Sequence, residues 1–129
     1  MAYPTGSGSE ILWRTSIGAL SGTETAFRFD GTNATTGTDS YTVPALHIIT
    51  VISISIHNVG TDTETFSLKS NQAVAGDIHL LQEESIAPKS TFIWNDRFVL
   101  VGGDALQCIV PTSPGNLDLH LSYIDQDWT

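Results

Sequence analysis

The chain has 129 residues, of which 40% are hydrophobic and 15% are charged, and this length predicts one domain with its own core. Fourteen acidic residues against five basic ones give a net charge of −9. A field of this sign repels phosphate backbones and anionic lipid headgroups, which argues against nucleic acid and membranes as partners.

The beginning of the chain is expected to differ from the rest. Residues 1–9 are rich in Gly and Ser and lack the positive and apolar regions of a signal peptide, so we predict a flexible arm and folding in a reducing cytoplasm. The arm is either an unimportant tail or a segment that reaches onto a neighbouring subunit. A single domain is expected at 10–129, with strands at 11–20 and 25–29 and a polar loop at 31–40.

The clearest strand signal lies at residues 47–59, where isoleucine alternates with serine and histidine. This alternation is typical of a strand with one face in a core. The inward face is predicted to carry Ile48, Ile52, Ile54 and Ile56. A turn at 58–62 and a return strand with Phe66 and Leu68 inward would complete a hairpin.

Further short strands are separated by turn residues through the second half of the chain. They are expected at 77–82, 90–94, 97–101, 106–110 and 117–123. No segment shows a convincing helical period, and residues 72–76 suffice for at most one helical turn. The sequence therefore predicts an all-β fold, an antiparallel β-sandwich of jelly-roll type with an extended N-terminal arm.

Recognisable catalytic and cofactor chemistry is missing from the sequence. There is no nucleophile elbow, phosphate-binding loop, dinucleotide fingerprint or zinc-type cysteine pair. The single cysteine, Cys108, excludes an intrachain disulfide, and its apolar neighbours predict a buried, inert thiol. We therefore predict a protein that is not an enzyme, with no catalytic residues, no metal ligands and no cofactor.

Titratable side chains offer only weak candidates for a metal site. No two of the four histidines are spaced as neighbours on one strand face, which favours surface or interface positions; they are His47, His57, His79 and His120. Asp62 with Glu64, and Asp125 with Asp127, have the oxygen ligands that Ca²⁺ prefers, but such loop pairs are more often only solvated. As the acid and base of a glycosidase these pairs are weaker candidates still.

Aromatic residues are the remaining candidates for binding, either as a sugar platform or as interface anchors. Tyr123 and Trp94 fit core positions by alternation, and Tyr41 joins the tryptophans as a possible platform residue. Trp128 is predicted either to dock into a partner subunit or to pack back on its own domain. The predicted interface residues are Tyr3, Pro4, Ile11, Trp13 and Trp128.

The order of several short motifs resembles small bacteriophage virion proteins of β-sandwich fold. These motifs are Tyr-Thr-Val-Pro-Ala at 41–45, the long strand at 48–59, Ile-Ala-Pro-Lys-Ser-Thr at 86–91, Val-Leu-Val-Gly-Gly-Asp-Ala-Leu at 99–106 and Leu-His-Leu-Ser-Tyr at 119–123. The resemblance covers residues 41–124. It implies a capsid decoration (cement) protein, or a neck, tail or fibre-associated protein.

The same resemblance implies the partners and the location. The expected partners are other virion proteins, the major capsid protein first, together with copies of the chain itself in a homo-oligomer, a trimer above all. The protein would be assembled in the bacterial host cytoplasm and reside in the virion. Small size, a single domain and no repetitive stalk favour the head over a tail fibre. A carbohydrate-binding module, or an enzyme or inhibitor of unknown type, remains as the alternative.

Overall fold

The computed structural model describes residues 9–20, 24–33, 41–110 and 115–129, which form nine strands and no helix. In this part of the chain there is accordingly no helix that could span a membrane. The strands are β1 (Ser9–Leu20), β2 (Thr25–Ala26), β3 (His47–Asn58), β4 (Glu64–Gln72), β5 (Gly76–Ile86), β6 (Thr91–Trp94), β7 (Phe98–Val101), β8 (Ala105–Ile109) and β9 (Leu117–Asp127).

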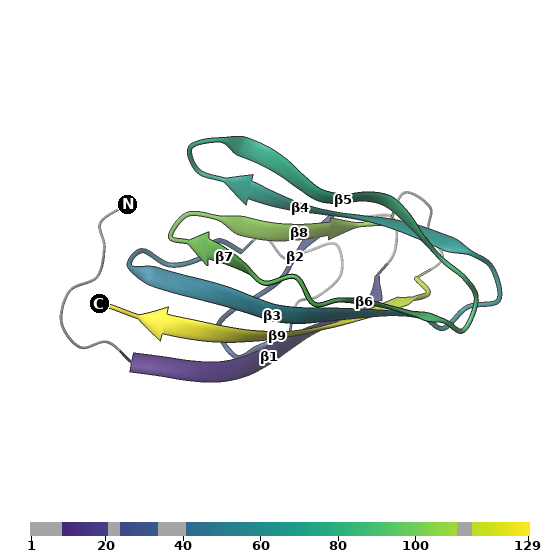
Figure 1. Ribbon diagram of the computed structural model, residues 1–129, viewed down its shortest axis with the longest axis horizontal. Coiled ribbons are helices and arrows are strands. Elements are labelled where there is room, and N and C mark those ends of the chain that lie inside the picture. Colours follow the sequence, from purple (N-terminus) through teal and green to yellow (C-terminus); the bar gives the residue numbers. More distant parts are fainter. Residues whose placement is uncertain (1–8, 21–23, 34–40, 111–114) are drawn as a thin grey trace.

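The strands form two antiparallel sheets that face each other (Figure 1). Sheet A has the order β1-β9-β3-β6, with β7 also paired to β3, and sheet B has the order β2-β8-β4-β5. Residues Ile54–His57 of β3 pair with β6, and Ile48–Val51 pair with β7, so these two short strands share one position in the sheet. This arrangement is a jelly-roll β-sandwich, and the predicted fold class is confirmed.

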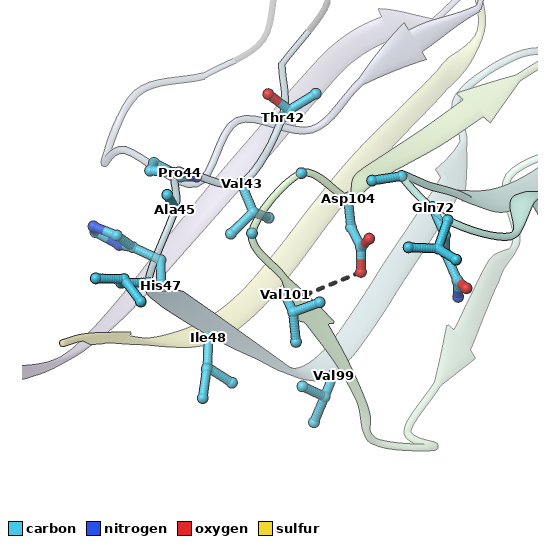
Figure 2. A pocket seen from close by; sticks show the side chains of 15 residues that line it. Thr42, Val43, Pro44, Ala45, His47, Ile48, Gln72, Val99, Val101 and Asp104 are labelled. Carbon is cyan, nitrogen blue, oxygen red and sulfur yellow. Dashed lines mark hydrogen bonds between the residues drawn. The ribbon is translucent and has the colours of Figure 1, made fainter. Parts of the chain in front are cut away.

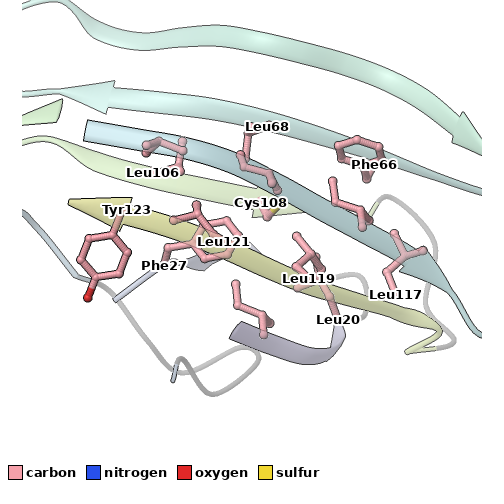
Figure 3. Close-up of a cluster of buried hydrophobic side chains, with 14 of the residues drawn as sticks. Leu20, Phe27, Phe66, Leu68, Leu106, Cys108, Leu117, Leu119, Leu121 and Tyr123 are labelled. Carbon is pink, nitrogen blue, oxygen red and sulfur yellow. The ribbon is translucent and has the colours of Figure 1, made fainter. Parts of the chain in front are cut away.

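The core fills the space between the sheets (Figure 3). From sheet B it receives Phe66, Leu68, Leu106 and Cys108, all fully buried. From sheet A it receives alternate residues of β9, which are Leu117, Leu119, Leu121 and Tyr123. The period-two pattern that predicted this last strand therefore also identified its buried face.

The predicted hairpin between the strand at 47–59 and the next strand is wrong. β3 lies in sheet A and β4 lies in sheet B, so the chain crosses between the sheets after Asn58. The buried Asn58 amide donates to the carbonyl oxygens of Asp62 (2.8 Å) and Ile86 (3.1 Å) and accepts from the Gly60 N–H (2.9 Å). Alternation of apolar and polar residues indicates which face of a strand is buried. It does not indicate which strand pairs with it, because strands of both sheets bury one face in the same core.

The predicted inward face of β3 is only half correct because the strand contains a β-bulge. Val51 lies opposite Tyr123, whereas Ser53 lies opposite Ser122, so one extra residue, Ile52, is accommodated between them. As a result the buried residues change phase along the strand, and they are Ile49, Val51, Ile54 and Ile56. Ile48 and Ile52 are only partly buried.

Two boundaries near the start of the chain also differ from expectation. The strand predicted at 25–29 is shortened to β2, although Phe27 and Phe29 that follow it are buried in the core. β1 already begins at Ser9, whereas residues 1–8 of the predicted arm lie outside the described residues.

Candidate functional site

The outer face of sheet A carries an unusual number of apolar side chains. Partners in register share a face, so Leu12, Ile124, Thr50 and Val99 form one row across the sheet. We call the outward apolar side chains of this sheet the apolar face; they are Leu12, Ile48, Ile93, Val99, Val101 and Ile124. Leu12 is 69% exposed, Ile93 61% and Val99 55%.

Sheet B presents the opposite chemistry on its outer face. Lys69 on β4 lies 2.8 Å from a Glu24 carboxylate oxygen and 3.1 Å from one of Asp77. Thr65 and Ser67 share this outward face of β4, because Glu64, Phe66 and Leu68 between and beside them are buried. The two outer faces of the sandwich are therefore not equivalent, and only sheet B has the ordinary surface of a solvated sheet.

A pocket of about 870 Å³ opens at the end of the sandwich where β3 begins (Figure 2). It is walled by the segment before β3, the β4–β5 turn and the β7–β8 turn, and its lining is mostly apolar. Asp104 contributes a carboxylate, but Oδ2 of this group accepts the Val101 N–H at 3.0 Å and the side chain is only 7% exposed. The pocket shares Ile48, Val99 and Val101 with the apolar face, so the two features are continuous.

The acidic pair predicted near the C-terminus lies in the last strand rather than in a tail. Asp125 and Asp127 on β9 both approach the His47 imidazole, with Nδ1 at 2.9 Å from Asp125 and Nε2 at 3.4 Å from Asp127. Hydrogen bonds from Thr129 lower the pKa of Asp127. These contacts join the ends of β3 and β9. Among the described residues no group of three or more His, Cys, Asp or Glu side chains is arranged to hold a metal ion.

A second, smaller hollow of about 390 Å³ lies at the β1 edge of sheet A. Its lining residues are Trp13, Arg14, Ser16, Gly31 and Asn33. We call this feature the Trp13 pocket. It differs from the large pocket because its walls are predominantly polar and contain a guanidinium group.

The structure describes three of the five predicted interface residues. Tyr3 and Pro4 lie outside the described residues. Ile11 and Trp13 are both on β1 and are 41% and 36% exposed. Trp128 is partly buried, and its backbone N–H donates to the Leu46 carbonyl at 3.1 Å, so it is tied to the start of β3.

Of the aromatic residues considered for a sugar platform, Trp13 and Tyr41 belong to one cluster through the buried rings of Tyr123 and Phe29, whereas Trp94 has a separate partner. Trp13 contacts Tyr123 edge to face, with ring centroids 6.4 Å apart. Trp94 instead stacks on Phe98 at 5.3 Å, and Tyr41 packs against Phe29 at 6.1 Å. No row of exposed rings forms on the described surface.

Sequence reasoning missed most of the apolar face. Leu12 stands next to Trp13 and Val99 next to Leu100, so each belongs to a continuous apolar run rather than to an alternating one. An apolar residue at a position that alternation assigns to the outer face of a strand would have indicated this surface. Such a position can be recognised only once it is known which alternate residues of the strand are buried.

Comparison with known proteins establishes the architecture. No protein-family model and no characterised protein sequence matches the chain. Among solved structures, the globular domain of the zebrafish complement 1qA protein matches with a TM-score of 0.52 and 12% identity, over 87% of this chain and 94% of that one. The fold is shared. At this identity the likeness extends to the fold alone.

A second solved structure, a chain of the IBDV viral particle, matches less well. Its TM-score is 0.42 at 6% identity, over 93% of this chain and 36% of that chain. This similarity is too low to support a conclusion.

Proposed function

We propose that the chain is a structural subunit of a bacteriophage virion, a capsid decoration (cement) protein that binds the major capsid protein as a homo-oligomer, with a trimer expected. The observation that carries the proposal is the apolar face on the outside of sheet A. The sequence resemblance over residues 41–124 supplies the virion context. Binding of the oligomer to a capsid lattice would stabilise the particle, because a ligand that binds only the assembled state favours that state.

The occupant of the apolar face is a second copy of the chain. Four strand positions about 4.8 Å apart, and the length of β3 at about 3.3 Å per residue, give a face of about 750 Å². A standard interface buries about 800 Å² on each partner, so one sheet face is of the right size. Exposed apolar side chains on one sheet face, Leu12, Ile93 and Val99 among them, are typical of an interaction site.

The charge distribution agrees with self-association. The middle of the face, from Leu12 to Val99, contains no ionisable side chain. The ionisable side chains with the same orientation lie outside this row; they are Glu10 and Arg14 on β1, Asp118 and His120 on β9, and His57 on β3. Two copies that each carry a net charge of −9 can therefore meet without bringing carboxylates into the centre of the contact.

Light scattering on purified protein at several concentrations tests the self-association. The wild type is expected to form a closed oligomer, whereas Leu12→Asp combined with Val99→Asp is expected to be a folded monomer, because buried unpaired carboxylates oppose the contact. Gln82→Asp combined with Ser85→Asp, which adds the same two charges at exposed positions of β5, is the matched control and should leave the mass unchanged. A monomeric wild type, or an oligomer that survives the double substitution, would contradict the proposed interface.

The virion assignment needs a separate measurement. Mass spectrometry of purified phage particles that encode this chain should detect it in stoichiometric amount, and chemical cross-linking should join it to the major capsid protein. Absence of the chain from intact particles would refute the virion role whatever its oligomeric state.

A further inference from the structure

We infer that the Trp13 pocket binds an acidic sugar, a monosaccharide unit that carries a carboxylate. The pocket volume of about 390 Å³ lies within the range of small-molecule sites in proteins. The inference does not depend on self-association, because one copy of the chain supplies every residue that lines the pocket. It adds a binding activity to the structural role proposed above.

The Trp13 ring forms an apolar wall that is held in place before any ligand binds. Its edge-to-face contact with Tyr123 has an interplanar angle of 79°. Gly31 lies directly against the six-membered ring, and a Cβ added there would be 3.1 Å from Cη2 of Trp13. With 36% of its surface exposed, the ring is still accessible for stacking. The C–H face of a sugar ring is apolar and packs on such a surface.

Arg14 supplies a cation without a partner among the described residues. Arg28 is paired with Asp30 at 2.8 Å, Lys69 is paired with two carboxylates and Lys89 donates to the Val59 carbonyl, which leaves Arg14 and Arg97 as the basic side chains without a partner among the described residues. The Arg14 side chain is exposed and lines the pocket beside Trp13. A guanidinium group binds a carboxylate through two parallel hydrogen bonds, which favours an acidic ligand over a neutral one.

Two further side chains complete the polar wall. The Ser16 backbone N–H donates to Asn33 Oδ1 at 3.2 Å, and this bond fixes the orientation of the amide. The amide nitrogen of Asn33 is then a donor of two hydrogens with no partner among the described residues. The Ser16 hydroxyl lies 3.3 Å from Nδ1 of His120 and can contact a ligand hydroxyl from the same side. The wall is rich in donors, which suits a ligand rich in acceptor oxygens.

A titration of the full-length, nitrogen-labelled protein followed through its tryptophan indole N–H signals tests this inference. The probes are methyl β-glucuronide and the methyl glycoside of N-acetylneuraminic acid, with methyl β-glucoside as the neutral control. Trp13→Phe assigns the signal of Trp13. We expect a saturable shift of this signal with at least one acidic probe, and binding of the glucoside at least about tenfold weaker, because it lacks the charged hydrogen bonds.

Two substitutions locate the site. Arg14→Met should weaken binding of the acidic probe about tenfold, and Asn33→Ala should weaken it by a smaller factor. Arg97→Met is the matched control, because Arg97 is also exposed and without a partner among the described residues but lies outside the pocket. It should leave binding unchanged.

Three outcomes would overturn the inference: no shift of the Trp13 signal at tens of millimolar probe, equal affinity for the glucoside, or equal losses in the two arginine variants. Val99→Asp alone, which lies on β7 away from Arg14, should retain sugar binding even where it weakens self-association. Failure of the proposed interface and failure of the sugar site are therefore distinguishable.

Discussion

Replacement of Tyr123 by phenylalanine tests how a buried phenol couples stability to alkaline pH. The Tyr123 side chain is fully buried, and its ring packs edge to face on Phe29 with centroids 4.9 Å apart. The phenol oxygen accepts the Gly31 N–H at 3.3 Å. Burial raises the pKa of Tyr123 to about 12, from an ordinary value of 10.0.

The sign of the pH effect follows from this raised pKa. Between about pH 10 and 12 the phenol keeps its proton in the folded state but loses it in the unfolded chain, so the free energy of unfolding falls as the pH rises through this window. At about pH 11 the loss is about 1.4 kcal/mol relative to neutral pH, and it approaches about 2.7 kcal/mol above the folded pKa. Near pH 8 the phenol contributes only its hydrogen bond, about 1 kcal/mol.

The wild type is therefore expected to be the more stable protein near neutral pH and the less stable one at high pH. Near neutral pH the variant should be less stable by about 1 kcal/mol, and close to pH 11 it should equal or exceed the wild type. Urea denaturation followed by tryptophan fluorescence at a series of pH values measures both free energies. The pKa values of Lys69 and Tyr41 are also raised, but these groups occur in both proteins and cancel in the difference. A difference that stays constant from neutral pH to pH 11 would refute the reasoning.

Two further predictions concern buried groups. Burial raises the pKa of the Cys108 thiol, so the native protein should not react with a disulfide reagent such as dithionitrobenzoate, whereas the urea-unfolded chain should react at once; rapid labelling of the native state would contradict the packing. Asn58→Ala removes three hydrogen bonds that hold the crossing between the sheets and should lower the free energy of unfolding by about 3 kcal/mol. A loss below about 1 kcal/mol in urea denaturation would mean that the crossing is fixed by other contacts.

Particular strands illustrate what sequence patterns could predict. β9 was located, and its buried face assigned, from simple alternation, and the inward residues Leu106 and Cys108 of β8 were found in the same way. β3 was located equally well, but its buried face was assigned correctly only after the bulge at Ile52. A bulge leaves no reliable mark in an isoleucine-rich strand, because either phase is apolar enough to be buried.

The candidate sites were less accessible than the fold. Trp13 was predicted as an interface residue, but its neighbours Gly31 and Asn33 approach it from a segment about twenty residues further along the chain. Arg14 was not predicted as a binding residue, because its lack of a carboxylate partner among the described residues can be recognised only from the tertiary structure.

The sequence by itself determined that the fold is all-β, because alternation of side chains along a strand is a local property of the extended backbone. Only the tertiary structure decided which strands are neighbours, where the chain crosses between the sheets and which of the two outer faces is apolar. Pairing joins residues as distant as Leu12 and Ile124, and a period of two is compatible with any antiparallel partner. The apolar face and the Trp13 pocket are products of that pairing.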